Sequence, residues 1–117
     1  MEHTEFGRAG EDIALAYLEK KKMKLLDRNV RSAHGEIDLI MDDGGTVVFV
    51  EVKARQNRRY GDPIEAVTPR KQRFIRFTAK MYLTSRRIEN RHVRFDVVEI
   101  MAAPGRETKI RHVKNAF

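Results

Sequence analysis

The sequence of 117 residues predicts a single α/β domain in which helices flank a mixed sheet. Two segments carry apolar residues at helical spacing, shorter segments between and after them are rich in β-branched and aromatic residues, and the two kinds alternate along the chain. The length fits one domain spanning residues 1–117. We place its core at residues 5–101, with 102–117 as a C-terminal turn and an edge strand. The expected order of elements is α-β-β-β-α-β.

The first helix is expected over residues 5–22. Ala14 and Leu18 belong to an apolar face that recurs at helical spacing, and three lysines fall in the last turn, where cations suit the helix dipole. A strand over residues 24–32 follows, and Gly35 breaks the chain after it.

The clearest strand signal is a β-hairpin. The apolar, β-branched runs 36–41 and 46–53 flank the turn sequence Asp-Asp-Gly-Gly at 42–45. If a loop of two or four residues centred on 42–45 closes the hairpin, the numbers of opposite residues sum to 87.

This register gathers charged side chains at one end of the hairpin. It places Glu36 opposite Glu51 and Asp38 opposite Phe49, so that Asp38 and Glu51 become diagonal neighbours within ~8 Å. Lys53 lies two residues beyond Glu51 and shares its face. The opposite face carries the apolar residues and is expected to supply core: Ile37, Leu39, Met41, Val48, Val50 and Val52.

Two interpretations of this charged cluster remain open from spacing alone. Carboxylates this close repel one another and suit a hard divalent cation such as Mg²⁺, whose activated water can attack a phosphodiester. Lys53 could then orient the water or stabilise charge developing on the phosphate. In the other interpretation the cluster is a solvated sheet end, where Lys53 forms a salt bridge with Glu51 or Glu36.

The second half of the chain completes the pattern. Thr68 as N-cap and Pro69 as the first helical residue predict a helix that reaches about residue 85. The remaining segments are a polar loop over 55–63, a strand over 92–101 and a short edge strand over 108–113.

The charge balance favours an anionic partner. The net charge is +7, and nucleic acid is the commonest partner of such a basic domain. Candidate phosphate contacts are Arg55, Arg58 and Arg59 in the loop, and Arg73, Arg76 and Lys80 on one side of the second helix. The other side of that helix is expected to pack inward through Phe74, Phe77, Met81 and Tyr82. A solvated amphipathic helix without a partner remains the alternative.

Several protein classes are excluded by composition. Cysteine is absent, which rules out disulfides, thiolate metal sites and a cysteine nucleophile, and which suits the reducing cytoplasm. No apolar run approaches the ~20 residues of a membrane span.

Two motifs in the hairpin resemble a known superfamily. Gly35-Glu36-Ile37-Asp38, followed by Phe49-Val50-Glu51-Val52-Lys53, resembles the D…(D/E)-x-K signature of restriction-endonuclease-like proteins. The wider pattern resembles the bacterial YraN-like family, which is similar to archaeal Holliday-junction resolvases. The supporting segments are Gly7 with Gly10-Glu11, Arg28-Asn29-Val30-Arg31, Gly61 with Pro63, Glu65-Ala66-Val67, Lys71-Gln72 and Arg94-Phe95-Asp96-Val97.

The resemblance implies a nuclease core with Asp38 and Glu51 as metal ligands and Lys53 as the catalytic lysine. It also implies a carboxylate on the first helix that completes the metal site, and Glu11 matches that position, although helical spacing alone favours a surface role for Glu11. Gln72, on the second helix, and Glu36 are candidate auxiliary residues.

We therefore expect a metal-dependent DNA endonuclease that uses Mg²⁺ or Mn²⁺ and acts on branched or otherwise structured DNA. The alternatives are a non-catalytic nucleic-acid-binding module that keeps the fold, and an interaction subunit of a larger complex. Nucleases of branched DNA often act as two-fold dimers, so a homodimer is a candidate assembly, but no segment of the sequence identifies an interface.

Overall fold

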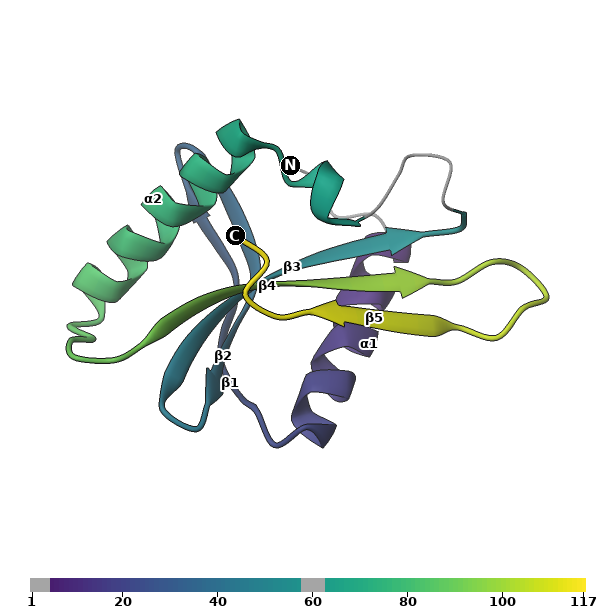
Figure 1. Ribbon diagram of the computed structural model, residues 1–117, viewed down its shortest axis with the longest axis horizontal. Coiled ribbons are helices and arrows are strands. Elements are labelled where there is room, and N and C mark those ends of the chain that lie inside the picture. Colours follow the sequence, from purple (N-terminus) through teal and green to yellow (C-terminus); the bar gives the residue numbers. More distant parts are fainter. Residues whose placement is uncertain (1–4, 58–62) are drawn as a thin grey trace.

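A five-stranded mixed sheet lies between two helices in the computed structural model, which describes residues 5–57 and 63–117 (Figure 1). The elements are α1 (Glu5–Lys20), β1 (Lys24–Ser32), β2 (Gly35–Asp43), β3 (Thr46–Arg55), the 3₁₀ turn η1 (Pro63–Ala66), α2 (Pro69–Ser85), β4 (Val93–Met101) and β5 (Lys109–Val113). The strands lie in the order β1-β2-β3-β4-β5, and only β3 and β4 are parallel. The predicted α-β-β-β-α-β order and the short edge strand after it are confirmed.

The helix boundaries follow from their capping residues. The Thr68 hydroxyl accepts a hydrogen bond from the backbone N–H of Lys71 at 3.2 Å, which caps α2 as predicted. The end of α1 comes two residues earlier than predicted, because Lys22 adopts a left-handed conformation (φ 72°) and the Met23 N–H donates back to the Leu18 carbonyl. Within the described residues, neither helix is long and apolar enough to span a membrane.

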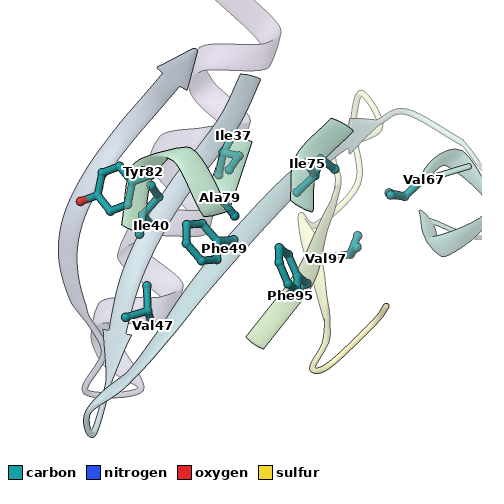
Figure 2. Packing of buried hydrophobic residues seen from close by; sticks show 10 residues of the cluster. All are labelled: Ile37, Ile40, Val47, Phe49, Val67, Ile75, Ala79, Tyr82, Phe95 and Val97. Atoms are coloured by element: carbon teal, nitrogen blue, oxygen red, sulfur yellow. The ribbon is translucent and has the colours of Figure 1, made fainter. Parts of the chain in front are cut away.

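Both faces of the sheet are buried, one under each helix. Val48 and Val50 pack with Leu18 of α1, whereas Val47 and Phe49 pack with residues of α2. Figure 2 shows the cluster on the α2 face, which comprises Ile37, Ile40, Val47, Phe49, Val67, Ile75, Ala79, Tyr82, Phe95 and Val97. Two covered faces explain why the apolar run of β3 is continuous rather than alternating.

The register of the β2–β3 hairpin differs from the predicted one. Asp43 pairs with Thr46, so that opposite residue numbers sum to 89 and the turn consists of Gly44 and Gly45 alone. Both glycines have positive φ (58° and 100°), which a two-residue hairpin turn of this kind requires and which glycine adopts at little cost. The predicted pairings of Glu36 with Glu51 and of Asp38 with Phe49 are therefore wrong. A shift of two residues nevertheless leaves each β3 side chain on its original face.

The regular ladder ends at the middle of the hairpin. The last β2–β3 pair is Leu39 with Val50, although both strands continue beyond it. Ile37 packs on the α2 face while Leu39 packs on the α1 face, so the alternation of β2 breaks at Asp38. On the neighbouring strand β1, Asn29 lies between the pairs that flank Asp38 and has a left-handed conformation (φ 54°). The prediction that Ile37 shares the face of Leu39 is wrong for this reason.

A buried carboxylate ties the C-terminal segment to the sheet. Asp96 is fully buried and accepts hydrogen bonds from the Arg94 guanidinium (2.9 Å) and the Asn115 N–H (2.9 Å). Its second oxygen lies 2.7 Å from Nε2 of His112. These bonds lower the pKa of Asp96 although burial alone would raise it, so this carboxylate has a structural role.

Candidate functional site

A pocket of about 530 Å³ opens where β2 and β3 no longer pair with each other, between the N-terminal halves of α1 and α2. Besides His34, the side chains that line it and can carry charge are four acids and two lysines: Glu11, Glu36, Asp38, Glu51, Lys53 and Lys71. The structure thus gathers the three hairpin residues of the predicted site with both candidate carboxylates, Glu11 and Glu36. It adds Lys71, which the sequence analysis placed only among the supporting segments.

Asp38 is held in place by the backbone of the facing strand. Its Oδ2 accepts a hydrogen bond from the Val52 N–H at 2.7 Å, at a position where the β2–β3 ladder has no backbone partner to offer. Burial and the charge of Glu51 raise the pKa of Asp38 to about 8, against the opposing effect of the Val52 bond. Asp38 and Glu51 are therefore close enough for their charges to disfavour one another.

Glu51 is the most enclosed acid of the hairpin, with 4% of its surface exposed. One oxygen, Oε2, lies 3.5 Å from the Lys71 ammonium and 4.0 Å from that of Lys53. The other oxygen, Oε1, is buried without a hydrogen-bond partner among the described residues. Burial raises the pKa of Glu51 despite the nearby Lys71 and Lys53.

The two lysines of the pocket have opposite pKa shifts. Burial, together with the hydrogen bond and the charge of Lys71, lowers the pKa of Lys53 to about 8. Burial would also lower the pKa of Lys71, but its hydrogen bond with Lys53 and the charges of Glu51 and Asp38 raise it. Lys71 therefore carries the more firmly held proton, and a fraction of Lys53 is a neutral amine near neutral pH.

Glu11 reaches the pocket because α1 approaches β3 closely. A Cβ added to Gly10 would lie 2.8 Å from the Cβ of Ala54, which is closer than two such carbons can approach. Only glycine fits this crossing without a shift of the helix. Glu11, the next residue, is 5% exposed and lies in the pocket wall.

Asn29 joins two of the carboxylates, a role that the sequence analysis missed. Its side-chain amide donates to Oε1 of Glu11 and to Oε1 of Glu36, each at 2.9 Å. Glu36 is also bonded through Oε2 to Arg31 at 3.1 Å, and Arg28 lies 3.7 Å from Glu11. An asparagine inside a strand, where this residue type is disfavoured, was the one available signal.

The carboxylates suit a cation held by two acids rather than a complete cage. Within the two described ranges, no three His, Asp or Glu side chains are grouped closely enough to hold a metal by themselves. Asp38 and Glu51 nevertheless provide two mutually repelling carboxylates, and Glu51 provides a buried oxygen without a hydrogen-bond partner. Mg²⁺ is commonly bound by one or two carboxylates together with waters and substrate phosphate, so these residues fit such an ion.

The predicted cations of α2 have different surroundings. Arg73, Arg76 and Lys80 are all exposed, but the Arg76 guanidinium also lies over the rings of Phe95 (4.6 Å) and Phe117 (5.7 Å). Arg76 is thus packed against aromatic rings on one side while it remains exposed, and its predicted contact with phosphate stays a prediction.

Two residues expected on the buried side of α2 are in fact exposed. Phe77 is 50% exposed and Met81 is 41% exposed, and the residues of α2 that are buried are Ile75, Thr78, Ala79 and Tyr82. The inward face is therefore rotated relative to the predicted one: Ile75 and Tyr82 meet the sheet together with the small side chains of Thr78 and Ala79.

The auxiliary candidate Gln72 and the three arginines predicted to contact nucleic acid from the loop lie outside the pocket or outside the described residues. The Gln72 amide donates to the Val67 carbonyl at 3.0 Å, where it stabilises the turn before α2 instead of lining the pocket. Arg55 is half-buried at the end of β3. Arg58 and Arg59 lie outside the described residues.

The fold and the pocket together define a small α/β protein with a site of carboxylates and lysines at the open end of a hairpin. Residues 10–100 match the uncharacterised protein family UPF0102, and the chain belongs to this family. It is 50% identical over 114 residues to a UPF0102 protein of Rhodococcus opacus (strain B4), and the aligned region covers 95% of this chain and 94% of that protein. It is also 48% identical over 111 residues to a UPF0102 protein of Symbiobacterium thermophilum, covering 95% and 94% of the two chains. The corresponding protein of Geobacter sulfurreducens is 45% identical over 111 residues, covering 95% and 87%. The predicted membership in the YraN-like family is confirmed.

Proposed function

We propose that this protein is a metal-dependent endonuclease that hydrolyses phosphodiester bonds of structured DNA. The observation that carries the proposal is the meeting of Asp38, Glu51 and Lys53 in one pocket, with one buried Glu51 oxygen left without a hydrogen-bond partner. The resemblance of the hairpin motifs to the restriction-endonuclease-like signature supports the same function.

Asp38 and Glu51 would hold the Mg²⁺ or Mn²⁺ ion, with Glu11 at the edge of the site. When bound, the ion would supply positive charge for the scissile phosphate and would acidify the attacking water. The Val52 N–H fixes the orientation of the Asp38 carboxylate by occupying Oδ2, which leaves Oδ1 for a ligand. Because both acids are buried, little water is available to stabilise their charges. A bound cation would provide that stabilisation instead.

Lys53 is suited to proton transfer from the attacking water. Its pKa of about 8 provides a neutral amine near neutral pH, and a base works best when its pKa lies near the working pH. Lys71 retains its proton and is suited to bind the anionic phosphate. In the absence of substrate, Lys71 lies beside Glu51, and its charge partly neutralises the buried acid.

One observation favours a second candidate, a nucleic-acid-binding module without catalysis. The cations already beside Glu51, together with the lack of a complete three-residue metal group in the described ranges, give a site that is stable without an ion. In that case the net charge of +7 would provide binding while the carboxylates would have a structural role.

Cleavage of defined DNA distinguishes the two functions. Linear duplex, flapped DNA and a four-way junction would be incubated with the wild type in Mg²⁺, Mn²⁺ or EDTA. The nuclease proposal predicts metal-dependent products that Asp38→Ala abolishes and that the surface control Glu89→Ala leaves unchanged. A wild type that binds these substrates but cleaves none of them with either metal would favour the binding module.

A further inference from the structure

An aromatic platform adjoins the candidate pocket. His34, in the turn between β1 and β2, stacks on Phe74 of α2, with ring centroids 5.6 Å apart and planes at 24°. It meets Phe77 edge to face, with centroids 4.6 Å apart. His34 and Phe74 both line the candidate pocket, and half of the Phe77 surface is open to solvent. We refer to these three residues as the aromatic platform.

The apolar surface continues along α2 away from the pocket. Met81, one turn beyond Phe77, is 41% exposed, and a shallow depression of about 450 Å³ lies between these residues and Lys80, Thr84 and Ser85. Phe74 and Met81 are seven positions apart, which corresponds to roughly 10 Å along the helix. At roughly 3.4 Å per stacked base this length corresponds to two or three nucleotides.

The charges around the platform match an anionic partner. The Arg70 guanidinium lies 5.4 Å from the Phe74 ring centroid, and Arg73 and Lys80 are exposed one turn to either side of Phe77. The helix α2 contains neither aspartate nor glutamate. A second copy of this chain would bring like charges together on this surface, which argues against self-association here.

We propose that the aromatic platform stacks unpaired bases next to the pocket, so that the substrate carries a single-stranded segment beside the bond to be cleaved. This inference rests on the proposed function and narrows its substrate class. Aromatic rings flanked by cations are the combination that binds single strands, because the rings accept base faces and the cations accept phosphates. In a continuous duplex the base faces are already stacked on one another and cannot reach the rings.

Fluorescence anisotropy in EDTA, where cleavage is prevented, tests the proposal. The probes are a fluorescein-labelled blunt duplex and the same duplex with a five-nucleotide single-stranded tail. The variants are Phe77→Leu, which keeps an apolar side chain but removes the ring, and Phe77→Tyr, which keeps the ring. Leu26→Ala is the matched control, because Leu26 is an apolar residue of β1 that is 38% exposed.

The proposal predicts that the wild type binds the tailed duplex at least fivefold more tightly than the blunt one. Phe77→Leu should lose this preference, while Phe77→Tyr and Leu26→Ala should keep it; a fivefold loss corresponds to the lower end of the stacking energy of one base. Equal affinity of the wild type for both probes, or a preference unchanged in Phe77→Leu, would overturn the inference and leave the proposed function standing. Failure to bind either probe would count against the proposed function itself. A dimer that becomes a monomer in Phe77→Leu without any change in the preference would instead identify the patch as an interface between copies.

Discussion

Replacement of Asp38 by asparagine should stabilise the metal-free protein and remove its response to metal. The substitution keeps the size of the side chain and an oxygen that can accept the Val52 N–H, but it removes one of the two repelling charges. In the wild type the pKa of Asp38 rises from 3.8 to about 8. The folded state therefore binds this proton more tightly than the unfolded chain, and the free energy of unfolding falls as the pH rises from about 4 to 8.

The size of the effect follows from the same shift. Each pKa unit corresponds to about 1.4 kcal/mol, so the ionised Asp38 can destabilise the fold by at most on the order of 5 kcal/mol. We expect Asp38→Asn to recover about 1–3 kcal/mol at pH 8, because the new amide is itself buried and must find a partner for its N–H groups. For a domain of this size the gain corresponds to a melting temperature higher by roughly 4–12 °C.

Thermal melts between pH 5 and pH 8 measure this effect, first in EDTA and then with Mn²⁺. The wild type should lose stability with rising pH in EDTA and should gain ~2.7 kcal/mol at a hundredfold excess of Mn²⁺ over its Kd. Asp38→Asn should show a flatter pH profile and little gain, whereas the exposed control Glu89→Gln should behave like the wild type. The reasoning is refuted if Asp38→Asn and the wild type have the same pH profile and the same response to Mn²⁺.

Three further substitutions test the supporting structure. Gly10→Ala should lower the melting temperature because its Cβ would collide with Ala54. The double variant Gly10→Ala/Ala54→Gly should recover most of this loss. If it recovers none, α1 does not cross β3 as closely as the structure shows. Asn29→Gly keeps the left-handed backbone but removes both hydrogen bonds to the carboxylates. Chemical denaturation should therefore show a free energy of unfolding lower by about 1–3 kcal/mol. An unchanged free energy of unfolding would show that the amide does not join the two acids. Arg73→Glu should weaken DNA binding across sequences and flatten the dependence of log affinity on log salt, whose slope is about −0.9 per neutralised phosphate; an unchanged slope would remove this residue from the DNA surface.

The sequence predicted the fold and the faces of β3 because those features depend on local patterns. Each element has its own periodicity and its own caps, as at Thr68 and Pro69. The error in register did not disturb the faces of β3, because moving the turn to Gly44 and Gly45 shifted the pairing by an even number of residues. The face of Ile37 was predicted wrongly because β2 breaks its alternation at Asp38, which no periodicity reveals.

The parts of the site that the sequence did not reveal depend on contacts between distant segments. Lys71 reaches Glu51 only because the connection after β3 returns α2 to the open end of the hairpin, and no local pattern specifies that path. The contact of the exposed Arg76 guanidinium with the rings of Phe95 and Phe117 likewise depends on the path of β4 and the C-terminus. Asn29 joins two acids that are 18 and 7 residues away along the chain.

The central claim is that Lys53 acts on the reaction rather than on binding, and one paired measurement tests it. The rate of metal-dependent cleavage and the affinity for the same DNA would be measured side by side for the wild type and Lys53→Ala. Lys53 is one cation among 24 lysines and arginines, so the affinity should change less than about threefold. The cleavage rate should fall by about 10²- to 10⁴-fold, as expected when a positioned general base is lost. A Lys53→Ala protein that cleaves as fast as the wild type would contradict the assignment of hydrolysis to this pocket.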